Sequence, residues 1–122
     1  MIQLGTALKS KEPPCHRCLI ISDPQTNGGQ IVLVRITTDD GTWPDRDCIL
    51  TQAEWGELEH DSTVAYSTCK YGPAVRALED AIRRRLFTVI SSPSAEVLRK
   101  VIAAGRVSAG MPPAAKALLA QV

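Results

Sequence analysis

Three polar residues that can take part in chemistry flank two apolar segments in the N-terminal half of the chain. His16 and Arg17 precede the apolar run 18–22, and Thr37 lies near the end of the run 30–38. A histidine titrates near neutral pH, so His16 can act as a general base or acid. Arg17 can pair with a phosphate group, and Thr37 can donate a hydrogen bond to a phosphate oxygen. These roles require the two segments to lie side by side. The structural alternative is that His16 anchors a strand and Thr37 forms a turn.

The elements that must position these residues are short strands. Runs of apolar and β-branched residues predict strands at about 3–8, 18–22, 30–38, 47–50 and 63–69, and the turn-forming segment 23–29 separates the second from the third. Thr51 and Glu54 have the spacing of a capping box, which predicts a short helix over 53–58. This spacing of strands favours a small antiparallel barrel, closed or nearly so.

The last fifty residues change to a helical pattern. Gly72 and Pro73 mark the break, and apolar residues at helical spacing follow over 75–86. A second helix is expected to begin at Ser92-Pro93 and to stop at Gly105, and a third to begin at Pro112-Pro113. The chain is therefore expected to consist of a barrel over 1–72 and a helical extension over 73–122.

The composition and the charge distribution exclude or disfavour some classes of protein function. The apolar fraction of 44% and the charged fraction of 22% exclude a wholly disordered chain, and only 4% of residues are aromatic, which disfavours binding of single strands by base stacking. Residues 1–72 hold six Lys and Arg and ten Asp and Glu, a charge of −4, whereas 73–122 hold eight and three, a charge of +5. With no signal peptide or membrane span in the sequence, we expect a cytoplasmic protein with no membrane contact.

Several short motifs together resemble the MazF/PemK toxin family. They are the segment from His16 to Ser22, the strand that ends in Ile36-Thr37-Thr38, and the shorter motifs Ser22-Asp23-Pro24, Asp45-Arg46-Asp47-Cys48-Ile49-Leu50 and Val64-Ala65-Tyr66. The match to the second family signature is good. The first family signature is an Arg-Pro dipeptide that leads into an apolar strand. Here His16 stands in place of that Arg, and Arg17 in place of that Pro. The chain thus resembles a divergent, uncharacterised PemK-like branch of the family.

This resemblance implies a mainly β fold with C-terminal α structure: a small SH3-like antiparallel barrel followed by two or three helices. It also implies a metal-independent endoribonuclease that acts on single-stranded RNA, with an antitoxin or other protein partner and a homodimeric assembly. His16 and Thr37 would be the catalytic residues, Arg17 and Thr38 would bind the substrate, and no cofactor is expected. The alternative is a non-catalytic interaction module of the same fold.

A further alternative is a structural zinc module held by cysteines. Cys15 and Cys18 form a C-x-x-C pair, and Cys48 and Cys69 could complete a four-thiolate site. The second pair is separated by twenty residues, and both of its members fall in expected strands. Isolated cysteines in strands usually serve as small apolar core residues.

Overall fold

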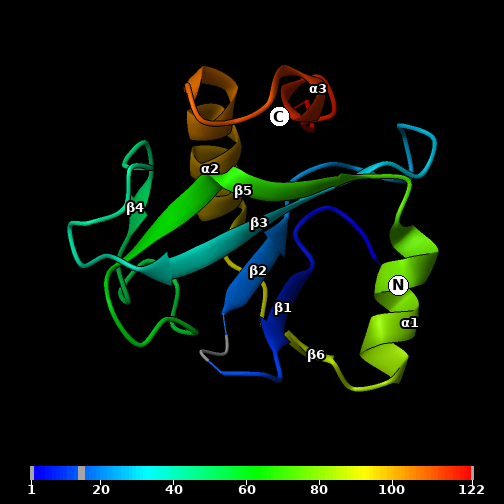
Figure 1. The fold of residues 1–122 in the computed structure, drawn as a ribbon, viewed down its shortest axis with the longest axis horizontal. Helices are drawn as coiled ribbons and strands as arrows, with labels where there is room; N and C mark the ends of the chain where they lie inside the picture. Colours follow the sequence, from blue (N-terminus) through cyan, green and yellow to red (C-terminus); the bar gives the residue numbers. More distant parts are fainter. Residues whose placement is uncertain (1, 14–15, 122) are drawn as a thin grey trace.

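The structure is a computed structural model that describes residues 2–13 and 16–121. It contains one antiparallel sheet and three helices (Figure 1). The strands and helices follow one another in the order β1 (Ala7–Ser10), β2 (Arg17–Ile20), β3 (Ile31–Thr38), β4 (Ile49–Leu50), β5 (Ser62–Gly72), α1 (Val75–Arg83), β6 (Phe87–Ile90), α2 (Ala95–Val107) and α3 (Pro113–Lys116). The expected mainly β fold with C-terminal helices is confirmed.

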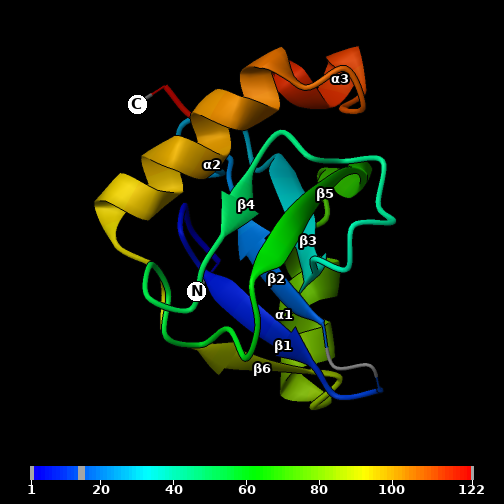
Figure 2. The same ribbon diagram turned by 90° about the vertical axis from the view of Figure 1, so that its left-hand side faces the viewer.

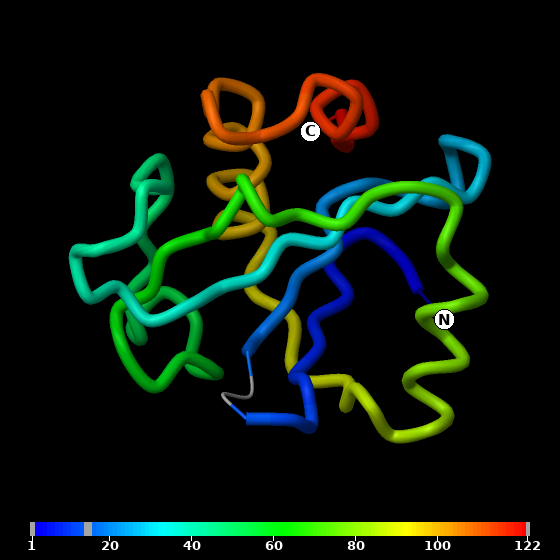
Figure 3. Tube along the Cα trace, in the orientation of Figure 1, coloured from blue at the N-terminus to red at the C-terminus, as the bar shows by residue number. Residues whose placement is uncertain are grey.

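The six strands form a sheet in the order β4-β5-β3-β2-β1-β6, in which every neighbouring pair is antiparallel. The tube trace shows β3 and β5 running alongside each other through the middle of the molecule (Figure 3). Within the described residues, no ladder joins β4 to β6, so the sheet stays open. Of the expected closed or nearly closed barrel, only full closure is corrected.

Each face of the sheet is covered by different helices (Figure 2). Strand residues alternate between the faces, so Val32, Val34 and Ile36 of β3 enter the larger core, which α2 and α3 complete. Ile31 and Leu33 belong to a smaller core that α1 covers through Leu78. The smaller core covers this face of the sheet only as far as Leu33. Arg35 and Thr37 lie on the uncovered part of the same face.

The first two strands are shifted relative to the sequence prediction. A turn closed by the Thr6 N–H to the Gln3 carbonyl, and Gly5 at a φ of +88°, delay β1 until Ala7. At the other strand, Ser22 falls outside β2. Its hydroxyl instead donates to the Gln30 carbonyl and accepts from the Val32 N–H, which closes the connection to β3.

The residues after position 72 were predicted to be helical throughout, and this prediction is wrong. The first helix was expected to extend over 75–86, but α1 ends at Arg83. Arg85 then takes a φ of +63°, an uncommon conformation for a residue other than glycine. The chain turns there and returns to the sheet as β6, which pairs with β1.

The predicted helix over 53–58 is also wrong, although its capping box exists. The Thr51 N–H donates to Glu54 Oε1 at 3.0 Å, and the Glu54 N–H donates to Thr51 Oγ1 at 3.2 Å. Turns follow rather than a helix, because Trp55 enters the larger core and its Nε1–H donates to the Ser91 carbonyl at 3.0 Å. The segment thus becomes a fixed loop leading to β5.

The two C-terminal helices have slightly different ends from those expected. Ser94, rather than Ser92, caps α2, its hydroxyl accepting from the Val97 N–H at 3.2 Å. Gly105 does not stop the helix, which continues to Val107. A Cβ at Gly105 would lie 3.1 Å from the Tyr66 ring, so this glycine allows close packing of α2 on β5. The third helix begins at Pro113, as predicted.

No helix within 2–13 and 16–121 is long and apolar enough to span a membrane. The division of the chain after residue 72 and the cytoplasmic location stay predictions.

Candidate functional site

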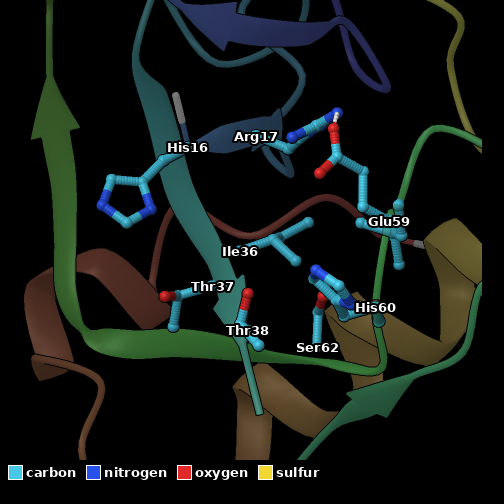
Figure 4. A pocket seen from close by; sticks show the side chains of 9 residues that line it. His16, Arg17, Ile36, Thr37, Thr38, Glu59, His60 and Ser62 are labelled. Atoms are coloured by element: carbon cyan, nitrogen blue, oxygen red, sulfur yellow. Dashed lines mark hydrogen bonds and ion pairs between the residues drawn. The ribbon is translucent and has the colours of Figure 1, made fainter. Parts of the chain in front are cut away.

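A cavity of about 260 Å³ opens where β2 begins and β3 ends (Figure 4). All four residues predicted to act on or bind a substrate line it, namely His16, Arg17, Thr37 and Thr38. The rest of the lining comes from Ile36 and from the segment that enters β5, with Leu58, Glu59, His60 and Ser62. The fold thus brings the two sequence segments together, while the roles of the four residues stay predictions.

The antiparallel pairing of β2 and β3 explains why His16 and Thr37 come together. Arg17 pairs with Ile36 in the ladder, and continuing that register by one residue places His16 opposite Thr37. The His16 carbonyl accepts from the Ser10 N–H at 3.0 Å, which fixes the backbone at this point. Figure 4 shows both side chains on the same side of β3.

Arg17 lies on the other side of the strand, as alternation requires. Its side chain is 16% exposed, and its Nη2 lies 3.3 Å from Oε1 of Glu59. The glutamate side chain is 68% exposed, so the ion pair lies at the mouth of the cavity. Carboxylates and phosphates present their acceptor oxygens to a guanidinium in a similar way. The position that Glu59 occupies at Arg17 therefore also suits a phosphate.

Three further lining residues, Glu59, His60 and Ser62, were not predicted from the sequence. They form the wall opposite His16 because the preceding loop is held at two points, by Trp55 on the Ser91 carbonyl and by Glu57, whose Oε2 accepts from the Ser91 N–H at 2.9 Å. The Ser62 hydroxyl donates to the His60 carbonyl at 2.8 Å. A polar Glu-His pair before a strand is a weak signal, and no spacing rule connects it to residue 16.

The burial of His16 and a neighbouring positive charge both favour its neutral form. Partial burial lowers the pKa of His16 from its ordinary value, and the positive charge of Arg35 lowers it further. The imidazole is therefore mostly unprotonated at neutral pH. A neutral imidazole can accept a proton, so the site holds a group suited to act as a base.

The described cysteines do not converge on a metal ion. Cys18 lies in the smaller core under α1, whereas Cys48 lies in the larger core and Cys69 packs against it, on the other face of the sheet. Cys15 lies outside the described residues. Among those that the structure describes, no three His, Cys, Asp or Glu side chains form a metal-binding group. The four-cysteine zinc site is therefore not supported.

The architecture defines a class of fold that solved structures share. The chain is similar to two crystal structures of MazE–MazF complexes from Deinococcus radiodurans, form II with a TM-score of 0.53 and form III with 0.54. Each is 16% identical in sequence, and the similarity covers 91% of this chain and 97% or 98% of the matched chain. No family model and no curated protein matches the sequence. The chain thus has a MazF-like fold, as the motifs in the sequence indicated.

Proposed function

We propose that the chain is a metal-independent endoribonuclease that cleaves single-stranded RNA in the cavity at the start of β2. The observation that carries this proposal is the position of His16 opposite Thr37, in one cavity with Arg17 and Thr38. The MazF-like fold supports the same reaction class.

The reaction is a transfer of the phosphate from the 5′ oxygen to the neighbouring 2′ oxygen. His16 accepts the proton of the 2′-hydroxyl while the 2′ oxygen bonds to phosphorus. The bond from phosphorus to the 5′ oxygen breaks, and His60, on the opposite wall, donates a proton to that leaving oxygen. The products are a 2′,3′-cyclic phosphate and a 5′-hydroxyl.

The remaining cavity residues bind the phosphate. Arg17 neutralises its charge, and the hydroxyls of Thr37 and Thr38 donate to its oxygens. Productive binding requires Arg17 to exchange the Glu59 carboxylate for the phosphate. The surroundings that lower the pKa of His16 keep the base ready before the substrate arrives.

The test is incubation of the purified protein with a long single-stranded RNA in excess EDTA. We expect cleavage by the wild type, a loss of about 100-fold or more for His16→Asn, and a loss of about 10- to 100-fold for Thr37→Val. Thr88→Val is the matched control, because Thr88 is an exposed strand residue of β6 outside the cavity. Undiminished cleavage by His16→Asn would assign the activity elsewhere.

The alternative proposal is a non-catalytic interaction module of the same fold. The ion pair of Arg17 with Glu59 favours this alternative, because the carboxylate already takes up part of the charge and hydrogen-bonding capacity of the guanidinium. An antitoxin-like protein partner and a homodimer are proposed with either function, on the likeness to the MazE–MazF complexes. RNA binding without cleavage, or neither, would favour the interaction module.

A further inference from the structure

A second cavity, of about 400 Å³, adjoins the first and shares His16 with it. It lies on the uncovered part of the sheet face that carries α1. Its lining comes from His16 and from residues of five strands, namely Ser10, Cys18, Leu33, Arg35, Thr68, Lys70 and Phe87. A volume of this size is in the range of pockets that hold small molecules.

The charge of this cavity is uniformly basic. Arg35 and Lys70 line it, and none of its described lining residues is acidic. Lys70 is exposed and makes no ion pair with the described residues. Such a pair of cations without a carboxylate attracts an anion.

Arg35 supplies a second, independent indication of a ligand. Its guanidinium carbon lies 5.6 Å from the centre of the Trp43 ring, a contact that orients the group. Its Nε is buried and has no hydrogen-bond partner among the described residues. Buried polar atoms are normally satisfied, so the Arg35 guanidinium keeps hydrogen-bonding capacity that no described residue takes up.

The register between β3 and β5 places the two cations on the same face of the sheet. The ladder between β3 and β5 pairs Leu33 with Lys70 but Arg35 with Ala65, so β5 carries extra residues in between. Thr68 lies in this bulge, and its hydroxyl donates to the Ala65 carbonyl at 3.1 Å. Bulges of this kind redirect side chains and are frequent beside functional sites. Because Lys70 pairs with Leu33, its side chain lies on the face that also carries Arg35, and both line the cavity.

We propose that this second cavity is a subsite for the nucleotide next to the cleaved bond. Arg35 and Lys70 bind its phosphate, and the apolar side chains of Leu33 and Phe87 contact its base or sugar. The proposal rests on the proposed function, because the two cavities share His16 as a lining residue. A strand of RNA thus enters the reactive cavity by way of the basic one, which locates binding in an otherwise acidic N-terminal half.

The experiment measures binding without cleavage. The probe is a fluorescent ten-nucleotide single-stranded RNA with 2′-O-methyl groups, titrated into the full chain at several salt concentrations. We expect Lys70→Gln to weaken binding several-fold and to reduce the slope of log Kd against log salt by about 0.7, the contribution of one phosphate contact on a single strand. Lys116→Gln, on α3 at the opposite face of the sheet, should leave affinity and slope unchanged.

Two further arms make the result decisive. Inorganic phosphate at the same phosphate concentration should not displace the probe, and displacement would assign the cavity to free anions instead. With a cleavable RNA, Lys70→Gln should slow cleavage of a ten-mer several-fold more than cleavage of a dinucleotide, which carries no phosphate besides the one that is cleaved. Equal affinity of Lys70→Gln and wild type, or no binding by either, would overturn the subsite. Altered binding without any cleavage would preserve the subsite and reject the nuclease.

Discussion

Arg17 and Glu59 form an ion pair at the mouth of the candidate site, with Nη2 of the arginine 3.3 Å from Oε1 of the glutamate. The two residues are 42 positions apart in sequence, and the loop before β5 brings them together. Under the proposed function a phosphate needs the place at the guanidinium that this carboxylate occupies, so we expect Glu59 to oppose the binding of RNA.

Replacing that carboxylate should therefore strengthen RNA binding. We expect Glu59→Gln to lower the Kd for the uncleavable ten-mer by about 3- to 10-fold, because removing an exposed negative charge beside a phosphate is worth about 1 kcal/mol. Glu96→Gln, the same change on α2, is the control. Weaker binding by Glu59→Gln would mean that the carboxylate positions Arg17 rather than competing with the substrate.

The pH dependence of cleavage should report the surroundings of His16. Because burial and Arg35 lower its pKa, the proton-accepting form persists to a lower pH than in a free imidazole. The cleavage rate should rise with pH through an inflection below 6.5 on its acidic limb. An NMR titration of the His16 ring should give the same inflection.

The arginine contribution to that shift can be isolated. Arg35→Gln removes a positive charge that disfavours the imidazolium, so the His16 inflection should move upward, toward the ordinary value. An unchanged inflection would attribute the shift to burial alone. Circular dichroism of this variant checks that loss of the contact with Trp43 leaves the fold intact.

The stability of the scaffold should depend on one buried hydroxyl. Tyr66 Oη donates to the Val101 carbonyl at 2.5 Å and so connects β5 to α2. Tyr66→Phe leaves that buried carbonyl without this donor, and we expect a loss of about 1–3 kcal/mol in the free energy of unfolding by urea. Tyr71→Phe, at a residue 44% exposed, should change it by less than about 0.5 kcal/mol.

The thiol of Cys18 should be unreactive. Its burial raises the pKa to about 11, although Arg35 opposes the shift. At pH 8 only about one thiol in a thousand would be ionised, and the thiolate is the reactive form. Peptide mapping after brief treatment with iodoacetamide should find Cys69, which is less buried, modified before Cys18. Early modification of Cys18 would show that the core under α1 opens readily.

The strands of the site were predictable because their signals are local. The β-branched run of β3 and the turn-forming residues before it define an antiparallel hairpin, and such a hairpin places His16 near Thr37. The opposite wall was not predictable. Glu59 and His60 reach the cavity only because Trp55 and Glu57 hold their loop to Ser91, a contact across more than thirty residues.

The missed strand β6 has a different cause. Phe87, Val89 and Ile90 are good strand residues, and the Ser-Ser-Pro sequence after them is a boundary signal. Leu86 fits the helical stripe of α1, however, and this extended the predicted helix past its true end. The turn uses Arg85 at positive φ, where a glycine would have marked the boundary.

The most direct test of the central claim is a DNA oligonucleotide that contains a single ribonucleotide, incubated with the wild type in EDTA. Attack by a neighbouring 2′ oxygen predicts one cut, immediately 3′ of the ribonucleotide, with a 2′,3′-cyclic phosphate on the 5′ fragment. The same oligonucleotide should survive His16→Asn. Cutting at deoxynucleotides, or a cut that this variant also makes, would contradict the account of a ribonuclease centred on His16.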